Sequence, residues 1–297
     1  MNRFMAMQTV VLSGLIQLVI LVSASARGDS FRTDEALHAR FLEVRDAIGM
    51  QGELNKIERE QVLKTDCGTP IREGIKLESN DFKLLIDPVD GRILSLQPEH
   101  DDSTDHEPRM SLEQAEATAA SILAKLGISI GRDMPVKSRD YREDTDTWAF
   151  TWEQQINGYP FPEAVQYILI GDQDGRLRYY KDTTIDYECP VQPVMEEAQA
   201  REAAKSCMES WIPVLWGNDY AVAGMATGNL QVVYPNRHYS VLEGPFDATM
   251  ESAEVVPCRV YSYDFTFRYT GTNALSIAVP PTRIWVDASR GNVVGGL

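Results

Sequence analysis

The densest cluster of potential metal ligands in this 297-residue chain lies between residues 99 and 107. The segment reads Glu-His-Asp-Asp-Ser-Thr-Asp-His-Glu and holds five carboxylates and two imidazoles. Carboxylate oxygens suit calcium and imidazole nitrogens suit zinc or copper, so the candidate ligands are His100, Asp102, Asp105 and His106. The spacing lacks the central glycine and closing glutamate of a calcium-binding loop. We therefore favour a solvated linker, extended by repulsion between like charges, over a metal site.

The familiar catalytic motifs are missing from the sequence. A zinc peptidase would carry H-E-x-x-H, which sets two imidazoles one helical turn apart with a general base between them. The G-x-S-x-G turn, the phosphate-binding loop and the dinucleotide fingerprint are also absent. The available imidazoles are His38, His100, His106 and His238. We predict no catalytic residue and no cofactor, and interpret the chain as non-enzymatic. A hydrolase site assembled across the fold is the third-ranked hypothesis.

Aromatic residues gather in a Gly- and Pro-containing segment near the C-terminus. Long loops with aromatic side chains often form interfaces, which makes the segment the first candidate for a partner-binding surface. Its candidate residues are Trp216, Tyr220, Tyr234, Tyr239 and Phe246. The alternative is that these side chains only pack the loop onto its own domain.

Composition limits the classes of partner. The chain has 28 Lys+Arg against 44 Asp+Glu, a formal charge of -16, and 43% hydrophobic residues. Nucleic acid and anionic lipid would be repelled by this charge, so neither is expected as the main partner. The apolar content and length predict two or three modules with cores of their own.

The N-terminus has the pattern of an export signal. One arginine, Arg3, precedes the apolar run Val10–Val22, and Ala24-x-Ala26 follows it. A bilayer-spanning helix needs about 20 apolar residues, whereas this run has the length of a signal-peptide core. We predict a signal peptide over residues 1–26, secretion or periplasmic location, and no stable membrane span after cleavage. An uncleaved anchor is the alternative.

Export would place the cysteines in an oxidising compartment. Four are present: Cys67, Cys189, Cys207 and Cys258. An even number without a C-x-x-C pair favours disulfides over a redox or zinc site. We prefer one bridge within the set Cys189, Cys207 and Cys258, and the alternative is buried thiols.

Three segments share one pattern: an apolar β-prone run, an Asp-containing turn that closes on glycine, and a second β-prone run. They are Ile86–Leu94, Ile170–Leu177 and Val286–Val294. Gly supplies positive φ and Asp can bond the turn backbone, so each reads as a β-hairpin. Three copies suggest an internal repeat. The turn glycines lie 84 and then 116 residues apart, so the third copy would carry an insertion.

Each hairpin follows a segment with helical spacing. Ser111-Leu112-Glu113-Gln114 is a capping-box pattern, and apolar residues then recur until Gly127. Similar stripes precede the other two hairpins, at Leu37, Phe41, Val44 and Ile48, and at Ala200, Ala203, Ala204, Cys207 and Trp211. Each helix has one apolar stripe and therefore needs a sheet to cover.

Alternating residues predict the strands of these sheets. Trp148, Phe150 and Trp152 share one strand face, and Asn157-Gly158 then turns the chain. Five aromatics alternate in a later strand and are expected to form core: Tyr261, Tyr263, Phe265, Phe267 and Tyr269. Leu230–Tyr234 is a further candidate strand. The expected domains are 27–109, including the acidic linker, 110–190, and 191–297 with an insertion at 212–257.

The chain resembles the PepSY and propeptide-like superfamily. The resemblance rests on the helix that opens at Ser111, on WAFTWEQQINGYPF, on YILIGDQDGRLRYYKDTT and, less closely, on RIWVDASRGNVVGG. It implies an α+β fold of tandem cystatin-like modules, each a helix on an antiparallel sheet of three to four strands. It also implies an exported binding module without catalytic residues, with a protein partner such as a peptidase or another envelope protein. The alternative is a structural or cation-sequestering envelope protein.

Overall fold

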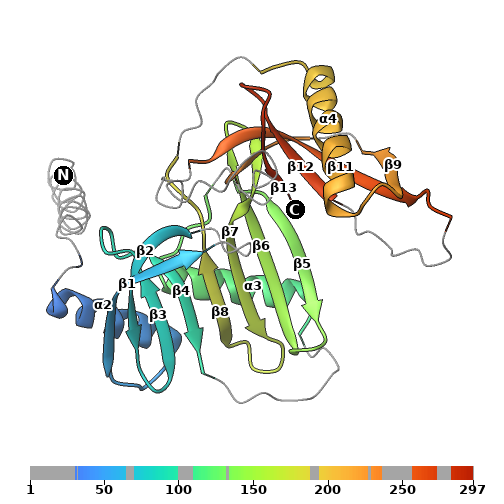
Figure 1. Cartoon of the computed structure of the whole chain (residues 1–297). Helices are drawn as coiled ribbons and strands as arrows, with labels where there is room; N and C mark the ends of the chain where they lie inside the picture. The colour runs from blue at the N-terminus through green and yellow to red at the C-terminus, as the bar shows by residue number, and fades with distance from the viewer. Residues whose placement is uncertain are drawn as a thin grey trace, which may run out of the picture.

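The computed structural model describes residues 31, 33–64, 70–99, 110–131, 134–187, 194–226, 229–235, 256–272 and 282–296. The predicted signal peptide, residues 1–26, lies outside these ranges. Within them the fold is α+β, with helices packed on antiparallel sheets, as predicted (Figure 1). No helix in the same ranges is long and apolar enough to cross a bilayer.

Three helices form at the predicted stripes: α2 (Asp34–Ile48), α3 (Leu112–Lys125) and α4 (Glu197–Leu215). Thr33 caps the start of α2 by accepting a hydrogen bond from the Ala36 N–H, and Gly49 caps its end. Ser111 and Gln114 form the predicted capping box of α3. The local signals for these helices are therefore confirmed. Helix α4 continues to Leu215, past residue 212, where the insertion was expected to begin.

Two helix-and-meander units share one eight-stranded sheet. The first unit runs from α2 through β1 (Lys56–Lys64), β2 (Pro70–Glu78), β3 (Phe82–Ile86) and β4 (Ile93–Pro98). The second runs from α3 through β5 (Val136–Arg142), β6 (Thr147–Ile156), β7 (Tyr159–Gly171) and β8 (Leu177–Asp182). The strand order is β1-β2-β3-β4-β8-β7-β6-β5. We expected a separate sheet for each helix, but the last strands of the two meanders, β4 and β8, pair and fuse the sheets.

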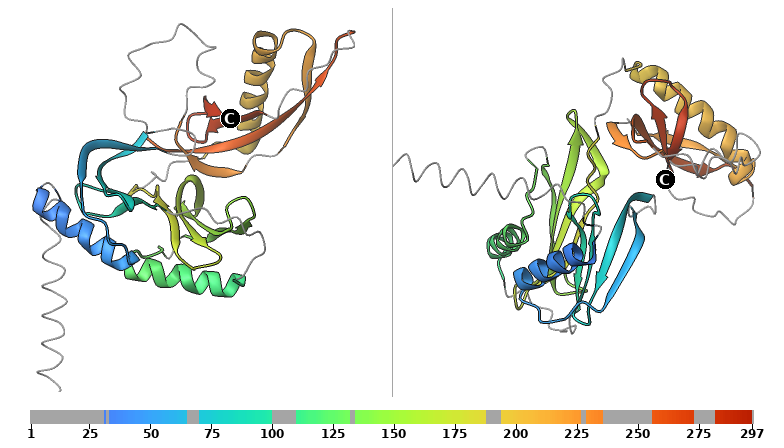
Figure 2. Two further views of the ribbon diagram at one scale, coloured as in Figure 1. Left: turned by 90° about the horizontal axis from the view of Figure 1, so that it is seen from below. Right: turned by 90° about the vertical axis from the view of Figure 1, so that its left-hand side faces the viewer.

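Helices α2 and α3 lie end to end on one face of this sheet, and the third unit lies on the other side (Figure 2). Their apolar stripes join a single buried cluster with residues from both meanders. Phe41 of α2 stacks on Phe82 of β3 with ring centroids 4.7 Å apart, and Phe150 of β6 belongs to the same cluster. Trp148 and Trp152 pack against it as the alternation predicts. The first two units therefore share one core.

The three predicted turns adopt the same backbone geometry. In each turn, the backbone N–H of the first turn residue donates to the carbonyl oxygen of the residue five positions later. The pairs are Asp87 and Arg92, Gly171 and Arg176, and Asp287 and Asn292. In each, the glycine donates back to that first residue and has positive φ, at +71° for Gly91, +64° for Gly175 and +77° for Gly291. A side chain at these positions would be strained, because positive φ is rarely tolerated by other residues.

The third unit has α4 on a five-stranded sheet. Its strands are β9 (Tyr220–Met225), β10 (Leu230–Val233), β11 (Cys258–Tyr269), β12 (Thr282–Asp287) and β13 (Val293–Gly296). The candidate strand at Leu230 is β10. Tyr261, Tyr263 and Phe265 of β11 are buried in the cluster that contains the α4 stripe, and Phe267 packs against it partly buried. Tyr269 lies outside the cluster, so the expected aromatic core is present for four of the five residues.

The third unit meets the second through a small apolar cluster. Val232 and Tyr234, from β10 and the residues just after it, pack against Ile156, Phe161 and Ala164 of the second unit. The Phe161 and Tyr234 rings lie 5.2 Å apart, and the Tyr234 N–H donates to Glu163 Oε1 at 3.3 Å. This contact joins two sheets by side chains, since β10 and β7 belong to different sheets.

Candidate functional site

A pocket of about 380 Å³ lies where the first and second units meet, and we call it the junction pocket. Helix α2, strands β4, β6, β7 and β8, and the end of α3 with its following loop all contribute to its wall. Its lining residues are Arg40, Arg92, Ile93, Leu126, Gly127, Ile128, Ser129, Gly131, Met134, Gln154, Gln155, Gln166, Tyr180, Asp182 and Thr184. Both units are needed to build it.

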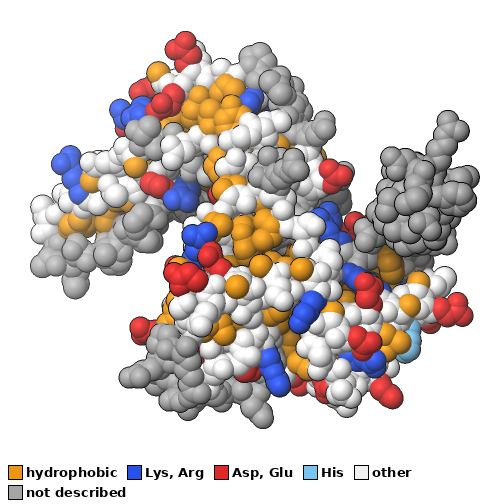
Figure 3. All heavy atoms as spheres, turned by 180° about the vertical axis from the view of Figure 1, so that it is seen from behind, with side chains coloured by type: hydrophobic (Ala, Val, Ile, Leu, Met, Phe, Trp, Pro, Cys, Tyr) orange, Lys and Arg blue, Asp and Glu red, His pale blue; other side chains and the backbone are white. Residues whose placement is uncertain are grey.

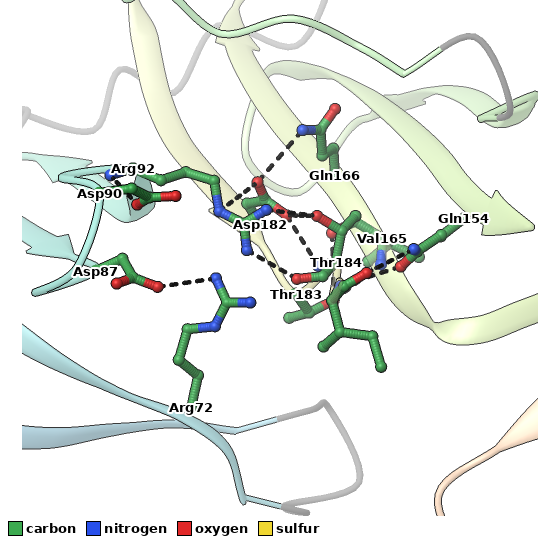
Figure 4. A network of polar contacts seen from close by, with 11 residues as sticks. Arg72, Asp87, Asp90, Arg92, Gln154, Val165, Gln166, Asp182, Thr183 and Thr184 are labelled. Atoms are coloured by element: carbon green, nitrogen blue, oxygen red, sulfur yellow. Dashed lines mark hydrogen bonds and ion pairs between the residues drawn. The ribbon is translucent and has the colours of Figure 1, made fainter. Parts of the chain in front are cut away.

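Arg92 closes the gap between the two meanders. The β4–β8 ladder pairs Ser95 with Lys181, and continuing this antiparallel register places Arg92 opposite Thr184. The Arg92 guanidinium donates from Nη1 to Thr184 Oγ1 at 3.2 Å and from Nη2 to the Thr184 carbonyl at 2.9 Å (Figure 4). A side chain therefore replaces backbone pairing at this point of the sheet, beside the pocket that it lines.

Asp182 is the buried anion of the site, with 1% of its surface exposed. Its Oδ1 accepts from the Thr184 N–H at 2.9 Å and the Thr184 hydroxyl at 2.6 Å. Its Oδ2 accepts from Gln166 Nε2 at 3.3 Å and lies 3.8 Å from Arg92 Nε. Buried charges are stable when they are paired and hydrogen-bonded. Asp182 meets that condition, so it organises the junction through contacts on both of its oxygens (Figure 4).

Gln166 of β7 is fixed in orientation by this carboxylate. An amide oxygen facing Asp182 would be repelled, so the amide nitrogen must be the atom that faces it. This orientation leaves Gln166 Oε1 as a buried acceptor without a hydrogen-bond partner. Such an atom costs free energy unless a ligand or water supplies a donor.

Tyr180 of β8 lies beside the same carboxylate. Its side chain is fully buried, and its hydroxyl interacts with Asp182 without forming a hydrogen bond of normal geometry. Burial, reinforced by the negative charge of Asp182 and by the interaction with its carboxylate, raises the pKa of the Tyr180 hydroxyl well above 10. The hydroxyl therefore stays protonated at neutral pH. Arg92 Nε is a second buried atom without a hydrogen bond of normal geometry, and it has a long ion pair to Asp182.

Arg40 connects helix α2 to the same region. Its Nε donates to the Gly91 carbonyl of the first hairpin turn at 3.1 Å, and its Nη1 lies 2.7 Å from Glu43 Oε2. The Arg40 side chain is mostly buried, whereas Glu43 is exposed. The pocket thus has two arginines and one aspartate in its wall, within a chain whose overall charge is -16.

A wider, shallower hollow lies beside the junction pocket and shares Arg92 with it. Its acidic residues are Glu73, Asp87, Asp90 and Asp186. Arg72 pairs with the largely buried Asp87 at 3.1 Å (Figure 4). Arg92 therefore separates a surface hollow richer in carboxylates from a pocket richer in arginine.

The candidate metal ligands His100, Asp102, Asp105 and His106 lie outside the described residues. Among the residues that the structure does describe, no group of three or more His, Cys, Asp or Glu side chains could hold a metal ion. The preference for a linker therefore stays a prediction.

The candidate partner-binding aromatics divide into two groups. Tyr239 and Phe246 lie outside the described residues. Trp216 packs on Phe267 with ring centroids 4.6 Å apart, and Tyr220 on Tyr269 at 5.3 Å. Tyr234 is buried against Phe161, where burial and the Glu163 charge raise its pKa to about 12. These three side chains contact the chain itself, and binding of a partner by the segment stays a prediction.

The disulfide candidates are distributed over the third unit. Cys207 lies on α4 and Cys258 opens β11, and no disulfide joins these two to each other. Cys189, like Cys67, lies outside the described residues. Cys207 packs against the cluster under α4, whereas Cys258 packs against a different cluster on the opposite face of the sheet.

Sequence reasoning did not single out the junction residues. Tyr180 and Asp182 lie inside YILIGDQDGRLRYYKDTT, which carried the resemblance, but a polar residue in a strand pattern does not reveal its partner. One usable signal was present in the sequence. Arg92 directly precedes β4 and Asp182 is the last residue of β8, and each of these strands is the last one of its meander. Charges at such positions are candidates for pairing between units.

Comparison with known proteins gives one family match. Residues 72–184 match the model of the YcdB/YcdC repeated domain. This segment contains the whole lining of the junction pocket except Arg40. The matched segment runs from β2 to the residues just after β8 and so crosses the fused sheet of the first two units.

Among solved structures, the chain is similar to the Bacillus megaterium YpeB C-terminal domain at 12% sequence identity. The alignment covers 89% of this chain and 96% of that one, with a TM-score of 0.42. That score is too low for the likeness to bear on function. No curated protein matches the chain.

Proposed function

We propose that this chain is a non-enzymatic, exported binding protein whose recognition element is the junction of its first two units. The supporting observation is the junction pocket, whose wall combines two arginines and a buried aspartate with three glutamine side chains: Arg40, Arg92, Asp182, Gln154, Gln155 and Gln166. Pockets with a few convergent polar groups are the usual form of a binding site. The tandem arrangement of PepSY-like units and export through residues 1–26 are part of this proposal.

The chemistry of the pocket favours binding over catalysis. Asp182 is its carboxylate, and hydrogen bonds from Thr184 and Gln166 already occupy both oxygens. A general base needs a free lone pair within reach of the substrate proton. The raised pKa of Tyr180 keeps its hydroxyl protonated, which suits a hydrogen-bond donor rather than a base.

The partner that we propose is a protein, with a secreted peptidase as the first candidate because the PepSY-like resemblance implies one. On the face seen in Figure 3, acidic and basic side chains are interspersed rather than separated. A mixed surface of this kind suits contact with proteins better than contact with a polyanion.

The test uses the chain expressed from its full coding sequence and purified from the exported fraction. It is added to secreted serine, cysteine and metallopeptidases, and hydrolysis of a fluorogenic peptide is followed. We expect slower hydrolysis by at least one peptidase and a complex with it on gel filtration. Arg92→Ala, which removes the side chain that hydrogen-bonds to Thr184 across the junction, should weaken both effects, whereas Arg176→Ala, an exposed arginine of the second turn, should not.

The proposal of a peptidase partner fails if no peptidase is slowed and none forms a complex. Cross-linking in the producing cells tests the broader proposal of a protein partner. It fails if wild type and Arg92→Ala are cross-linked to the same proteins in the same amounts.

A further inference from the structure

We propose that the surface hollow beside the junction pocket is a docking groove for an extended protein segment that carries cationic side chains on either side of an aliphatic one. We call this feature the acidic hollow. The inference rests on the proposed function, since it takes the partner to be a protein, and it adds the place and the chemistry of the contact.

Both of the first two units build the acidic hollow. Arg72 and Glu73 of β2 and the turn residues 88–90 come from the first unit, whereas Ile185 and Asp186 follow β8 of the second. Its volume is about 830 Å³, against about 380 Å³ for the junction pocket. A surface hollow of this size admits a short stretch of extended chain.

The exposed charge of the hollow is negative. Its exposed carboxylates are Glu73, Asp90 and Asp186. The fourth carboxylate, Asp87, is largely buried and pairs with Arg72 at 3.1 Å (Figure 4). The other arginine, Arg92, lies 3.8 Å from the buried Asp182. Each arginine thus has a carboxylate of its own, and three further negative charges face solvent from the wall.

These three carboxylates are spread around the hollow rather than gathered at one point. In the ranges that the structure describes, no three His, Cys, Asp or Glu side chains are close enough to hold a metal ion. A calcium ion would need several oxygen ligands at about 2.3–2.6 Å. Separate ammonium or guanidinium groups, each beside one carboxylate, suit the spread better. An extended segment offers them at every second residue on one of its sides.

An aliphatic side chain stands among these charges. Val89 has 68% of its surface exposed, although it belongs to an ordered turn. The turn fixes its position, because the Val89 N–H donates to Asp87 Oδ1 at 2.7 Å. Pro88 and Ile185 lie half-buried in the same wall. An aliphatic side chain of a partner can therefore bury apolar surface here against a preformed contact.

The charge of the whole molecule favours the same occupant. With a formal charge of -16, the chain attracts cationic segments at long range and repels a second copy of itself. An acidic segment would also meet the three exposed carboxylates at short range.

The test titrates three capped pentapeptides into the full exported chain at low salt. The first is acetyl-Lys-Ser-Leu-Ser-Lys-amide, which in extended form places both lysines and the leucine on one side. The second has Glu in place of both Lys, and the third has Ser in place of Leu. Binding heat and the methyl chemical shifts of Val89 and Ile185 are recorded. We expect the first peptide to bind most tightly, to shift both methyl signals and to lose affinity as salt is added.

Variants assign the binding to the acidic hollow. The triple variant Glu73→Gln, Asp90→Asn and Asp186→Asn should weaken the first peptide about 3- to 30-fold. Val89→Ser should weaken it about 3- to 10-fold. All four side chains are exposed, so the melting temperature should hold.

Two matched controls remove similar groups elsewhere. Glu143→Gln with Asp144→Asn removes exposed charges between β5 and β6, and Val214→Ser removes an exposed valine near the end of α4. Both controls should bind the first peptide as wild type does.

The inference is overturned if no peptide binds, or if the second or third peptide binds as tightly as the first. Wild-type affinity in the triple variant or in Val89→Ser would overturn it equally. Calcium tests the alternative of an ion site, and displacement of the peptide by calcium at an ionic strength where sodium has no effect would also overturn it.

These failures differ from failure of the proposed function. A chain that forms a complex with a peptidase without binding the first peptide keeps the function and loses the inference. A chain that binds the peptide but slows no peptidase and shows no Arg92-dependent cross-linking does the opposite.

Discussion

The two contacts between units of this molecule are built differently. The first and second units share a sheet, a core cluster and a buried carboxylate that is bonded across the junction. The second and third units keep separate sheets and meet through a small apolar cluster, with a hydrogen bond from the Tyr187 hydroxyl to the Pro257 carbonyl and Arg259 over the Tyr159 ring beside it. The buried residues of that cluster are Ile156, Phe161, Ala164, Val232 and Tyr234. The first contact resembles the interior of one domain, whereas the second resembles the docking of two domains. Two buried polar atoms without a hydrogen bond, Arg92 Nε and Gln166 Oε1, lie at the contact between the first and second units, where the β4–β8 ladder is short.

The largest effect is expected in the shared core. Phe82→Ala removes a fully buried ring that stacks on Phe41 of α2. The free energy of unfolding should fall by about 3–5 kcal/mol, because a cavity replaces the ring. Urea denaturation should show the first two units unfolding together. The exposed Val89→Ala is the control and should change stability by less than about 0.5 kcal/mol. Separate unfolding of the first unit would contradict the description of one shared core.

A smaller and more local effect is expected between the second and third units. Tyr234→Ala removes the ring that packs on Phe161 and should cost about 2–3 kcal/mol of docking free energy. Hydrogen exchange should quicken in β10 while β7 and β8 keep their protection. Tyr220→Ala, which loses a ring contact inside the third unit, is the control. Equal loss of protection in β8 would show that all three units form one cooperative body.

The buried carboxylate beside the first junction should contribute less than the core. Asp182→Asn removes the charge that accepts hydrogen bonds from Thr184 and Gln166 within the second unit and that pairs with Arg92 of the first unit. We expect a loss of about 2 kcal/mol, the range for hydrogen bonds to a charged group. Denaturation of Asp182→Asn against the exposed Asp186→Asn measures the difference. An unchanged stability would mean that the buried charge of Asp182 adds nothing to the folded state.

The smallest effect is expected for Tyr180→Phe near neutral pH, within about 0.5 kcal/mol, since the hydroxyl has only its interaction with Asp182, which lacks normal hydrogen-bond geometry, to lose. Alkaline pH should separate the two proteins. The folded state holds the Tyr180 proton more tightly than the unfolded state, whose pKa is about 10. The free energy of unfolding that this tighter proton binding contributes is fully present below pH 10, and it is lost as the pH rises toward the folded-state pKa. Wild type should therefore lose stability more steeply than Tyr180→Phe above pH 10, and parallel curves would contradict the assignment.

Local features of this fold were predictable, because their causes are local. The capping box at Ser111 and the apolar stripe of α2 depend on residues within a few positions of one another. The hairpin turns likewise depend on one Asp or Gly and one glycine four residues later. Tyr261, Tyr263 and Phe265 were identifiable as core from their alternation alone.

The junction was not predictable, because its causes are distant in the chain. Nothing in the residues of β4 indicates that its free edge will pair with β8. The same residues would suit an edge exposed to solvent or paired with another chain. Arg92 and Thr184 lie 92 positions apart, and their contact exists only once the two sheets have met. Tyr180 also looked like an ordinary core tyrosine, since a sequence cannot reveal that its hydroxyl ends beside a pocket. The candidate site therefore emerged from packing between units.

The central position of β4 also sets an order of events in time. The edge of the first meander cannot be covered until the chain has emerged as far as Thr184, 92 residues after Arg92. At ordinary rates of synthesis that interval is roughly 5–20 s. Uncovered strand edges attract other strands. The early life of this molecule therefore includes a period of exposure to mispairing, which ends only when the second meander is complete.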